Sequence, residues 1–231
     1  MRPIALIRGL SFESGAGYWP AFEAGFRRKR GTAHPEMVIN IGLDLKQTLA
    51  AFENRGWDGV AELALEAGQR ARQAGAQALL LAGCTSQIIA PQVAAGQELP
   101  LISLLDAVGS EARENGFSTV GLLGSRLTLS HHYFRGRLKD THGLRSLVPE
   151  PADIEIINTC LYREVVQGRV TAASRAEIAR ISALLSSLGA QALIPAFAGL
   201  ETLLKEEGFE LPLLDPVVLH ARAGLEFALG D

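Results

Sequence analysis

An internal repeat constrains the fold of this chain more than any other feature. The run Gly-Ala-Gln-Ala-Leu begins at Gly75 and again at Gly189, and 189 − 75 = 114. Two weaker matches have similar spacings. The segment at Ile4 resembles the segment at Val120 (120 − 4 = 116), and the segment at Leu99 resembles the segment at Leu211 (211 − 99 = 112). A repeat on this scale predicts two copies of one α/β unit that face each other across a cleft.

Composition supports a large packed core and argues against a nucleic-acid partner. The 231 residues are 48% hydrophobic and 20% charged, and the formal net charge is −3. Binding to phosphate backbones needs a basic surface, so we expect no nucleic acid as partner. One basic run, Arg27 to Arg30, is open to two interpretations: a solvated helix end, or a rim that attracts anionic substrates.

The sequence predicts a cytoplasmic protein that does not enter the membrane. Residues 1–10 contain Arg2 and Arg8 around a short apolar run, which does not fit a signal peptide. No stretch approaches the roughly 18 apolar residues of a membrane span. The two cysteines do not make a disulfide framework, and a reducing compartment suits them.

The segment after the first copy of the repeat combines a strand, a turn and polar side chains. Residues 78–82 are apolar, as in a parallel strand that is covered on both faces, and Gly83 ends this strand. Thr85 or Ser86 can then cap a helix, which would bring backbone N–H groups close to Cys84. Such a turn suits a carboxylate ligand beside a nucleophile or base.

Strands alternate with helices along the whole chain. This rhythm predicts parallel sheets joined by right-handed crossovers. The last strand and helix follow a complete second unit, so one segment is expected to cross back to the first domain. We therefore predict a first domain of residues 1–105 and 208–231 and a second domain of residues 106–207. The predicted strands are 3–7, 37–41, 78–82, 101–105, 120–123, 147–148, 192–196 and 211–214.

Several motifs, in order, resemble those of the aspartate/glutamate racemase superfamily. Residues 4–14 resemble the opening "IGLIGGMSWES" of that family, and residues 121–128 resemble its "GLLGTRxTM". Residues 162–165 resemble "IYEEL", and 214–221 resemble "FDTTxIHA". The resemblance implies two flavodoxin-like domains related by pseudo-twofold symmetry, with the ligand cleft between them. It also implies a homodimer, no cofactor, and proton transfer at the carbon alpha to the carboxylate of a small amino acid or dicarboxylate.

The family mechanism uses two acid–base groups, usually one cysteine after the key strand of each half. In the second half Phe197 stands at the cysteine position and cannot carry a proton. In the first half two alignments remain open. Without a gap, Gly83 takes the base position; with a bulge of one residue, Cys84 is the base. Cys84 is our candidate catalytic residue, because a nearby helix N-terminus lowers a thiol pKa toward neutrality.

Racemisation by two thiols is therefore disfavoured, and other outcomes are open. A single base allows chemistry on one face of the substrate: decarboxylation, isomerisation, elimination or cyclisation. A relative that binds a carboxylate without catalysis is the alternative from another class. Groups that could replace the missing acid are Glu13, Glu201, His131, His132 and His220.

Polar residues at the predicted turns are either caps or substrate contacts. Arg8, which replaces a family glycine, is either a lid or a partner for a substrate carboxylate. His131 and His132 are adjacent on a predicted helix and should face apart, so we expect no metal site. Cys160 is predicted to be a core residue. The expected substrate-binding residues are Arg8, Ser11, Thr85, Ser86, Ser125, Thr128 and Phe197.

Overall fold

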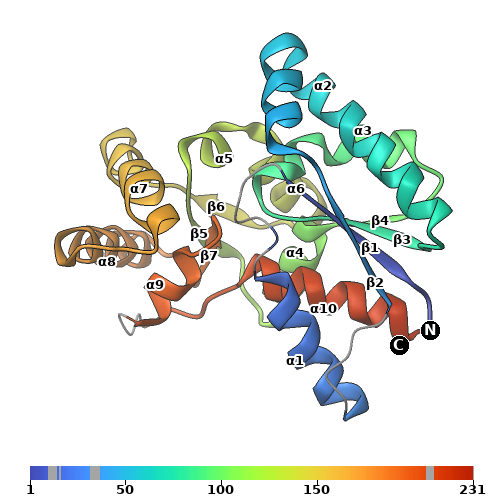
Figure 1. The fold of residues 1–231 in the computed structure, drawn as a ribbon. Coiled ribbons are helices and arrows are strands. Elements are labelled where there is room, and N and C mark those ends of the chain that lie inside the picture. Colours follow the sequence, from blue (N-terminus) through green and yellow to red (C-terminus); the bar gives the residue numbers. More distant parts are fainter. Residues whose placement is uncertain (10–14, 16, 32–36, 207–210, 231) are drawn as a thin grey trace. The chain divides into compact units, whose positions relative to one another are not determined.

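The computed structural model describes residues 1–9, 15, 17–31, 37–206 and 211–230. These form two compact units (Figure 1). The first comprises Met1–Leu104 and Val217–Asp231, and the second comprises Leu105–Pro216. None of the helices in the described ranges combines the length and the apolar character that a membrane crossing requires.

The first unit is built on a four-stranded parallel sheet in the order β2-β1-β3-β4. Helices α1 and α10 cover one face, and α2 and α3 cover the other (Figure 1). Both faces are buried, which explains the unbroken apolar run of the central strand. The strands are β1 (Ile4–Arg8), β2 (Val38–Gly42), β3 (Ala78–Leu81) and β4 (Leu101–Ile102). The helices are α1 (Tyr18–Arg30), α2 (Leu45–Gln73), α3 (Ala90–Gly96) and α10 (Pro216–Leu229).

Aromatic side chains of α1 and small residues of α10 fill the core on one face of this sheet. Tyr18, Phe22 and Phe26 are four residues apart, so they share one side of α1, and all three are buried. They pack with Leu225 and its neighbours from α10 against alternate residues of β1 and β3. The end of the chain is thus part of the first core.

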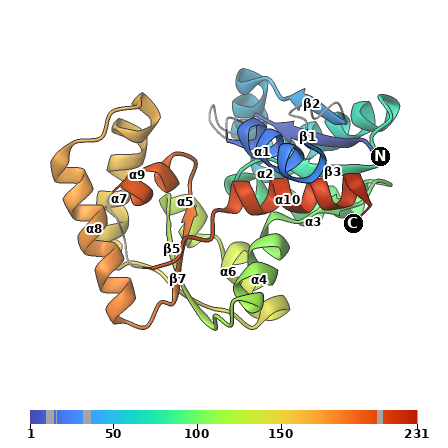
Figure 2. The same cartoon turned by 90° about the horizontal axis from the view of Figure 1, so that it is seen from below.

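The second unit has a three-stranded parallel sheet in the order β6-β5-β7. Leu213 adds a single bridge beside Leu193, at the position of a fourth strand. Helices α7, α8 and α9 lie on one side of the sheet, and α4 and α6 lie on the other (Figure 2). The strands are β5 (Thr119–Gly124), β6 (Arg145–Leu147) and β7 (Ala192–Ala196). The helices are α4 (Leu104–Glu114), α5 (Arg126–Ser130), α6 (His132–His142), α7 (Pro151–Arg163), α8 (Ala172–Ser187) and α9 (Leu200–Glu206).

The predicted fold class is confirmed: each unit is an α/β domain with a parallel sheet. The second sheet, extended by Leu213, has the same strand order as the first, the flavodoxin-like order 2-1-3-4. The repeated sequences fall on equivalent strands, because Ile4 pairs with Ala78 in the first sheet and Val120 pairs with Ala192 in the second. The internal repeat is therefore a repeat of structure.

The division of the chain differs from the predicted domain boundaries near the C-terminus. Residues 211–216 belong to the second unit, because the Leu213 bridge and the hydrogen bond from Leu214 N–H to the Leu193 carbonyl hold them beside β7. The two units also exchange helices. Helix α4 follows a strand of the first unit but lies almost wholly in the second, and α10 follows the Leu213 bridge but packs in the first.

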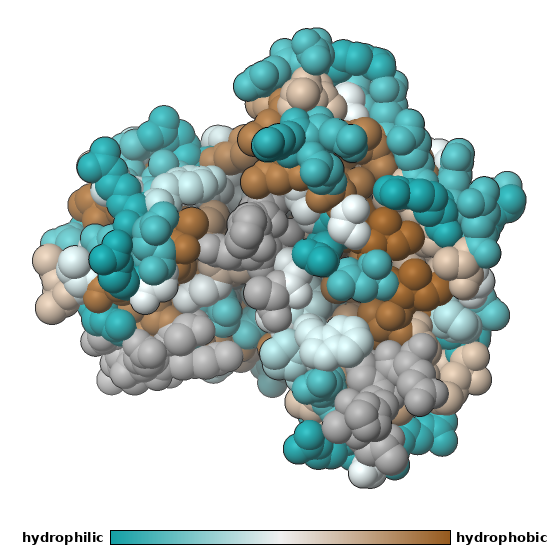
Figure 3. Space-filling model, viewed as in Figure 1, coloured by the Kyte–Doolittle hydropathy of each residue, from teal (hydrophilic) through white to brown (hydrophobic). Residues whose placement is uncertain are grey.

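Helix α2 consists of two parts that meet at a kink. It runs from Leu45 and is kinked at Gly56, whose φ of 60° is in the left-handed region. Hydrophobic residues reach the surface over its first turns (Figure 3), where Leu49 is 53% exposed and Phe52 is 42% exposed.

Candidate active site

Parallel pairing brings two connections together at the carboxyl edge of each sheet. In the first unit, Ile7 of β1 pairs with Leu81 of β3, so Arg8 and the turn at Cys84 leave the sheet at the same edge. In the second unit, Gly124 of β5 pairs with Ala196 of β7, so Ser125 and Phe197 emerge side by side. This edge is where α/β proteins bind their ligands.

The turn after β3 is tight and is held by its own side chains. Gly83 has φ of 86°, a left-handed conformation that favours glycine. Cys84 follows with 9% exposure and immediately precedes a 3-10 helix, η1 (Thr85–Ile89). The Gln87 side-chain amide donates to the carbonyls of Leu81 and Gly83, each at 3.1 Å. The thiol therefore sits in a fixed turn at the end of a buried strand.

The predicted helix cap at Thr85 or Ser86 is wrong. No side chain caps η1, and the Ser86 hydroxyl turns back to the carbonyls of Ala82 and Gly83, at 2.9 and 2.7 Å. The segment after the strand is a 3-10 turn followed by α3, and not one continuous α-helix. Thr85 is half-buried and Ser86 is buried. Ser86 directs its donor at the backbone, and contact with substrate stays a prediction for both residues.

A chain of buried hydrogen bonds connects this turn to α10. The His220 Nε2 lies 2.9 Å from the Ile102 carbonyl, and the Tyr18 hydroxyl lies 2.6 Å from the His220 Nδ1. A carbonyl only accepts, so Nε2 carries the proton and Nδ1 accepts from Tyr18. The Tyr18 oxygen in turn accepts from Gly83 N–H at 3.4 Å. The chain of donors thus runs from the turn through α1 to α10 and β4.

Arg8 leans toward the outer strand β2. Its side chain is exposed, its Nε donates to the Asn40 side-chain oxygen at 2.9 Å, and its guanidinium is next to Gly42. Cys84 follows β3, on the opposite side of β1. The predicted contact of Arg8 with a substrate carboxylate remains a prediction. Ser11 and Glu13 lie outside the described residues.

The turn after β5 is closed by two buried hydroxyls. Ser125 is the N-cap of α5, where its oxygen accepts from Thr128 N–H at 3.3 Å. The two hydroxyl oxygens are 3.1 Å apart, and both residues are at most 2% exposed. This capping role is one of the two alternatives that the sequence left open, and a role in substrate binding remains a prediction.

Phe197 occupies the turn after β7. Its ring meets Tyr162 edge to face, with centroids 5.6 Å apart, and it packs against the core of the second unit. With the strands aligned as the repeat requires, Gly83 corresponds to Phe197, and Cys84 to Ala198. The left-handed glycine of this turn is Gly199, so the two turns follow different paths.

Comparison with known proteins identifies the family. The sequence pattern of the Asp/Glu/Hydantoin racemase family matches residues 7–224. The chain belongs to this family. A candidate Asp/Glu racemase from Yersinia pestis has a similar structure, with a TM-score of 0.92, 27% identity, and coverage of 99% of this chain and 100% of the other.

Two further structures share the fold of this family member. An aspartate racemase homologue from Pyrococcus horikoshii OT3 has a TM-score of 0.88 at 24% identity, with 99% of this chain and 100% of the other covered. An arylmalonate decarboxylase has a TM-score of 0.56 at 13% identity, with 98% and 92% covered. The same fold thus occurs in proteins named for different reactions.

Other candidates have structural roles in this racemase-family chain. Cys160 is 2% exposed in the second core, where burial and the nearby Glu164 carboxylate raise the pKa of its thiol. The prediction that His131 and His132 face apart is wrong: their rings stack at 5.1 Å, because His131 is the N-cap of α6 and not part of the helix. Among the described residues no group of three His, Cys, Asp or Glu side chains could hold a metal ion.

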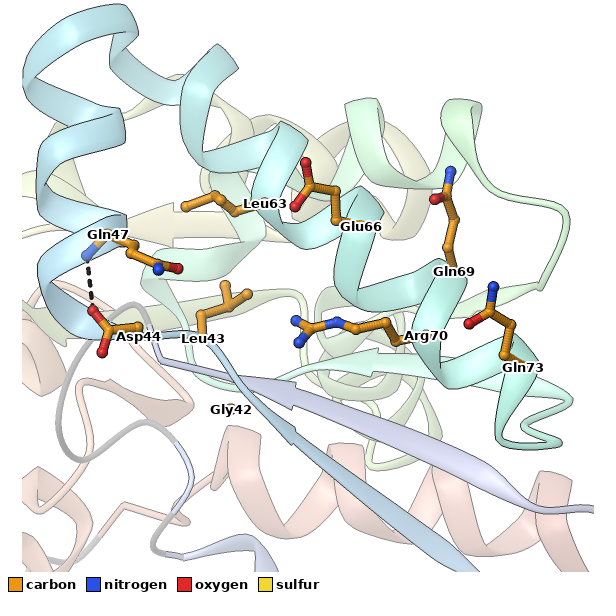
Figure 4. A pocket seen from close by; sticks show the side chains of 9 residues that line it. All are labelled: Gly42, Leu43, Asp44, Gln47, Leu63, Glu66, Gln69, Arg70 and Gln73. Carbon is orange, nitrogen blue, oxygen red and sulfur yellow. Dashed lines mark hydrogen bonds between the residues drawn. The ribbon is translucent and has the colours of Figure 1, made fainter.

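A polar hollow of about 440 Å³ lies beyond the end of β2, against α2. Figure 4 shows Arg70 extending from α2 toward Leu43 and Gly42, with the Glu66 carboxylate one helical turn away. None of the predicted site residues lines this hollow. We therefore assign the candidate active site to the strand-end turns instead.

Sequence reasoning missed Tyr18 and named His220 as a group that could replace the missing acid. The two are 202 residues apart, and neither belongs to a local motif for such a bond. Tyr18 opens the helix after the first loop, and its aromatic spacing with Phe22 and Phe26 indicates a core residue. Its hydroxyl contact with Gly83 becomes visible only in three dimensions.

We expect the buried His220 to make folding pH-dependent. Burial lowers the pKa of His220 to about 4 in the folded protein, whereas the pKa of an unfolded histidine is about 6.5. The unfolded state then binds more protons between these values, so stability is lost as the pH falls through this range, by roughly 3 kcal/mol. Urea unfolding between pH 7 and 4 measures the loss.

The control for this prediction is His220→Gln, whose amide can both donate to Ile102 and accept from Tyr18 but does not titrate. The variant should lose less stability than the wild type over the same pH range. Parallel loss in the two proteins would show that His220 is not the responsible group.

Proposed function

We propose that this racemase-family protein catalyses cofactor-independent proton transfer at the carbon alpha to a carboxylate. The substrate is a small amino acid or dicarboxylate, and Cys84 is the group that moves the proton. Family membership supports the reaction class. The placement of Cys84 in the turn after β3, at the carboxyl edge of the sheet, is the observation that carries the assignment. We further propose that the protein acts as a homodimer.

The proposed step uses the thiolate of Cys84 as base. The substrate C–H bond breaks, the proton moves to sulfur, and the electron pair of the bond delocalises onto the carboxylate as an enolate. Backbone N–H groups and hydroxyls at the strand ends would stabilise this charge. The thiol then returns a proton to carbon. Because a free thiol has a pKa of about 8.5, modest stabilisation of the thiolate makes this exchange feasible near neutral pH.

Phe197 makes the proposed chemistry one-sided. Racemisation requires removal of a proton from one face of the carbon and delivery to the other. The aromatic ring at residue 197 cannot deliver one, and it packs on Tyr162. With a single thiol, exchange should return the proton to the face from which it left. The same arrangement suits decarboxylation or isomerisation, in which a proton acts on one face only.

Replacing Cys84 should abolish the proton exchange. We expect the wild type to incorporate deuterium at the alpha carbon of L-aspartate or L-glutamate in D₂O, and we expect Cys84→Ala to slow this by at least about a hundredfold. Proton NMR of the alpha position measures the rate. Cys160→Ala is the matched control, because it removes the other thiol from a buried site far along the chain.

Equal rates in the wild type and Cys84→Ala would contradict the assignment of the base. Absence of exchange in the wild type with both acids, together with measurable binding of either acid, would instead favour a carboxylate-binding relative without catalysis.

Placing a thiol at residue 197 tests the one-sided chemistry. The wild type should exchange deuterium into an L-amino acid with retention of configuration. Phe197→Cys should add racemisation, seen by chiral chromatography as the growth of the D-enantiomer. Phe197→Ala, which removes the ring without adding a proton carrier, should not. Efficient racemisation by the wild type would overturn the proposal that a single thiol limits the exchange to one face.

A further inference from the structure

A second hollow lies entirely within the second unit, between α6 and the edge strand β6. It encloses about 620 Å³, a volume in the range of small-molecule sites. His132, Arg135 and Lys139 are spaced three and four residues apart, so they share one face of α6. Gly136 and Gly143 keep the space beside them open, and Arg145 and Ser146 of β6 line the other side. We call this hollow the α6–β6 groove.

The groove concentrates positive charge on a chain whose net charge is −3. Arg135, Lys139 and Arg145 are basic side chains, and no carboxylate is among the described residues that line the groove. Asp140 lies close by, since its oxygen would be 3.9 Å from a Cβ at Gly136. The three cations that line the groove outnumber this carboxylate.

These cations differ from other arginines of the same unit. Arg137, also on α6, makes two hydrogen bonds to the Asp106 carboxylate, at 2.9 and 2.7 Å. Arg180 pairs with Asp153 and Glu177. No ion pair found in the described part of the chain involves Arg135, Lys139 or Arg145. Carboxylates thus hold Arg137 and Arg180, whereas Arg135, Lys139 and Arg145 face a hollow.

Two buried donors in the groove provide an independent observation. The Nε of Arg135 and the hydroxyl of Ser146 are both inaccessible, and neither has a hydrogen-bond partner among the described residues. Such groups are rare in folded proteins because a buried unpaired donor is costly. One comes from α6 and the other from β6, so each side of the groove has an unpaired donor, which a ligand oxygen could satisfy once the side chain turns toward the hollow.

We propose that the α6–β6 groove binds the phosphate group of a small phosphorylated molecule. A phosphate monoester carries close to two negative charges near neutral pH and presents three strong acceptor oxygens. It therefore matches several cations and unpaired donors better than a single carboxylate does. A duplex would need a longer basic surface than one groove on an acidic chain. This site does not depend on the proposed reaction at Cys84.

Calorimetric titration with inorganic pyrophosphate tests the proposal, and succinate serves as the carboxylate comparison. We expect pyrophosphate to bind more tightly than succinate and to weaken with added salt. Lys139→Gln and Arg145→Gln change exposed residues, and each should weaken pyrophosphate binding by about tenfold or more. Arg163→Gln is the matched control: it removes one exposed positive charge from α7, on the other side of the sheet, and should leave binding unchanged.

Ser146→Ala separates a binding role from a structural one. It removes an unpaired buried hydroxyl, so the melting temperature of the free protein should stay the same or rise, while pyrophosphate binding weakens. Unchanged binding in Lys139→Gln and Arg145→Gln would overturn the proposal, as would failure of pyrophosphate to bind at millimolar concentration. Tighter binding of a 20-nucleotide oligomer through the same residues would also overturn it, in favour of a nucleic-acid site.

Discussion

A hydrogen-bond chain through the Tyr18 hydroxyl connects the turn after β3, helix α10 and strand β4 of the first unit. It joins the turn after β3 to the imidazole of His220, and His220 in turn holds the backbone of β4. Tyr18 belongs to the helix that follows the first strand, and His220 belongs to the last helix of the chain. The turn that carries Cys84 is therefore supported by residues from both ends of the sequence.

That support requires the exchange of helices between the two units. If α10 packed beside its own half of the repeat, one face of the first sheet would lose Leu225 and its neighbours, and His220 could not reach Tyr18. The reciprocal position of α4 shows that the exchange follows from the duplication and is not an isolated detour of the C-terminus. Both sheets are completed in this way by chain from the other half.

Within this repeated frame the two key turns have diverged. The first has a left-handed Gly83 followed by a thiol, and it is braced by Ser86 and Gln87. The second carries Phe197, whose ring is packed on Tyr162. Equivalent strands have thus kept their register while the residues after them changed. This difference is the physical basis for proposing chemistry on one face of a substrate.

The sequence was sufficient to predict the features that arise from local pattern and repetition. The Gly75 and Gly189 repeats gave two α/β units, and the apolar run before Gly83 gave a buried parallel strand. It could not show which way a polar side chain turns: Ser86 was one of two candidate helix caps, but its hydroxyl bonds back to the carbonyls of Ala82 and Gly83. It also could not show that Arg137 has a carboxylate partner while Arg135 has none among the described residues, because that depends on where Asp106 lies in the fold. Such long-range pairings are set by packing.

The reactivity of Cys84 in the native protein is the most direct test of its proposed role as a base beside a bound carboxylate. Alkylation by iodoacetamide and by iodoacetate, followed over pH by mass spectrometry, reports both the thiolate and any preference for a carboxylate. Buried Cys160 serves as the internal reference in the same chain. We expect Cys84 to be alkylated faster than Cys160 near neutral pH, and faster by iodoacetate than by iodoacetamide. Aspartate should slow this alkylation. A Cys84 that stays unmodified while the protein is folded, or that reacts no faster than Cys160, would contradict the proposed role.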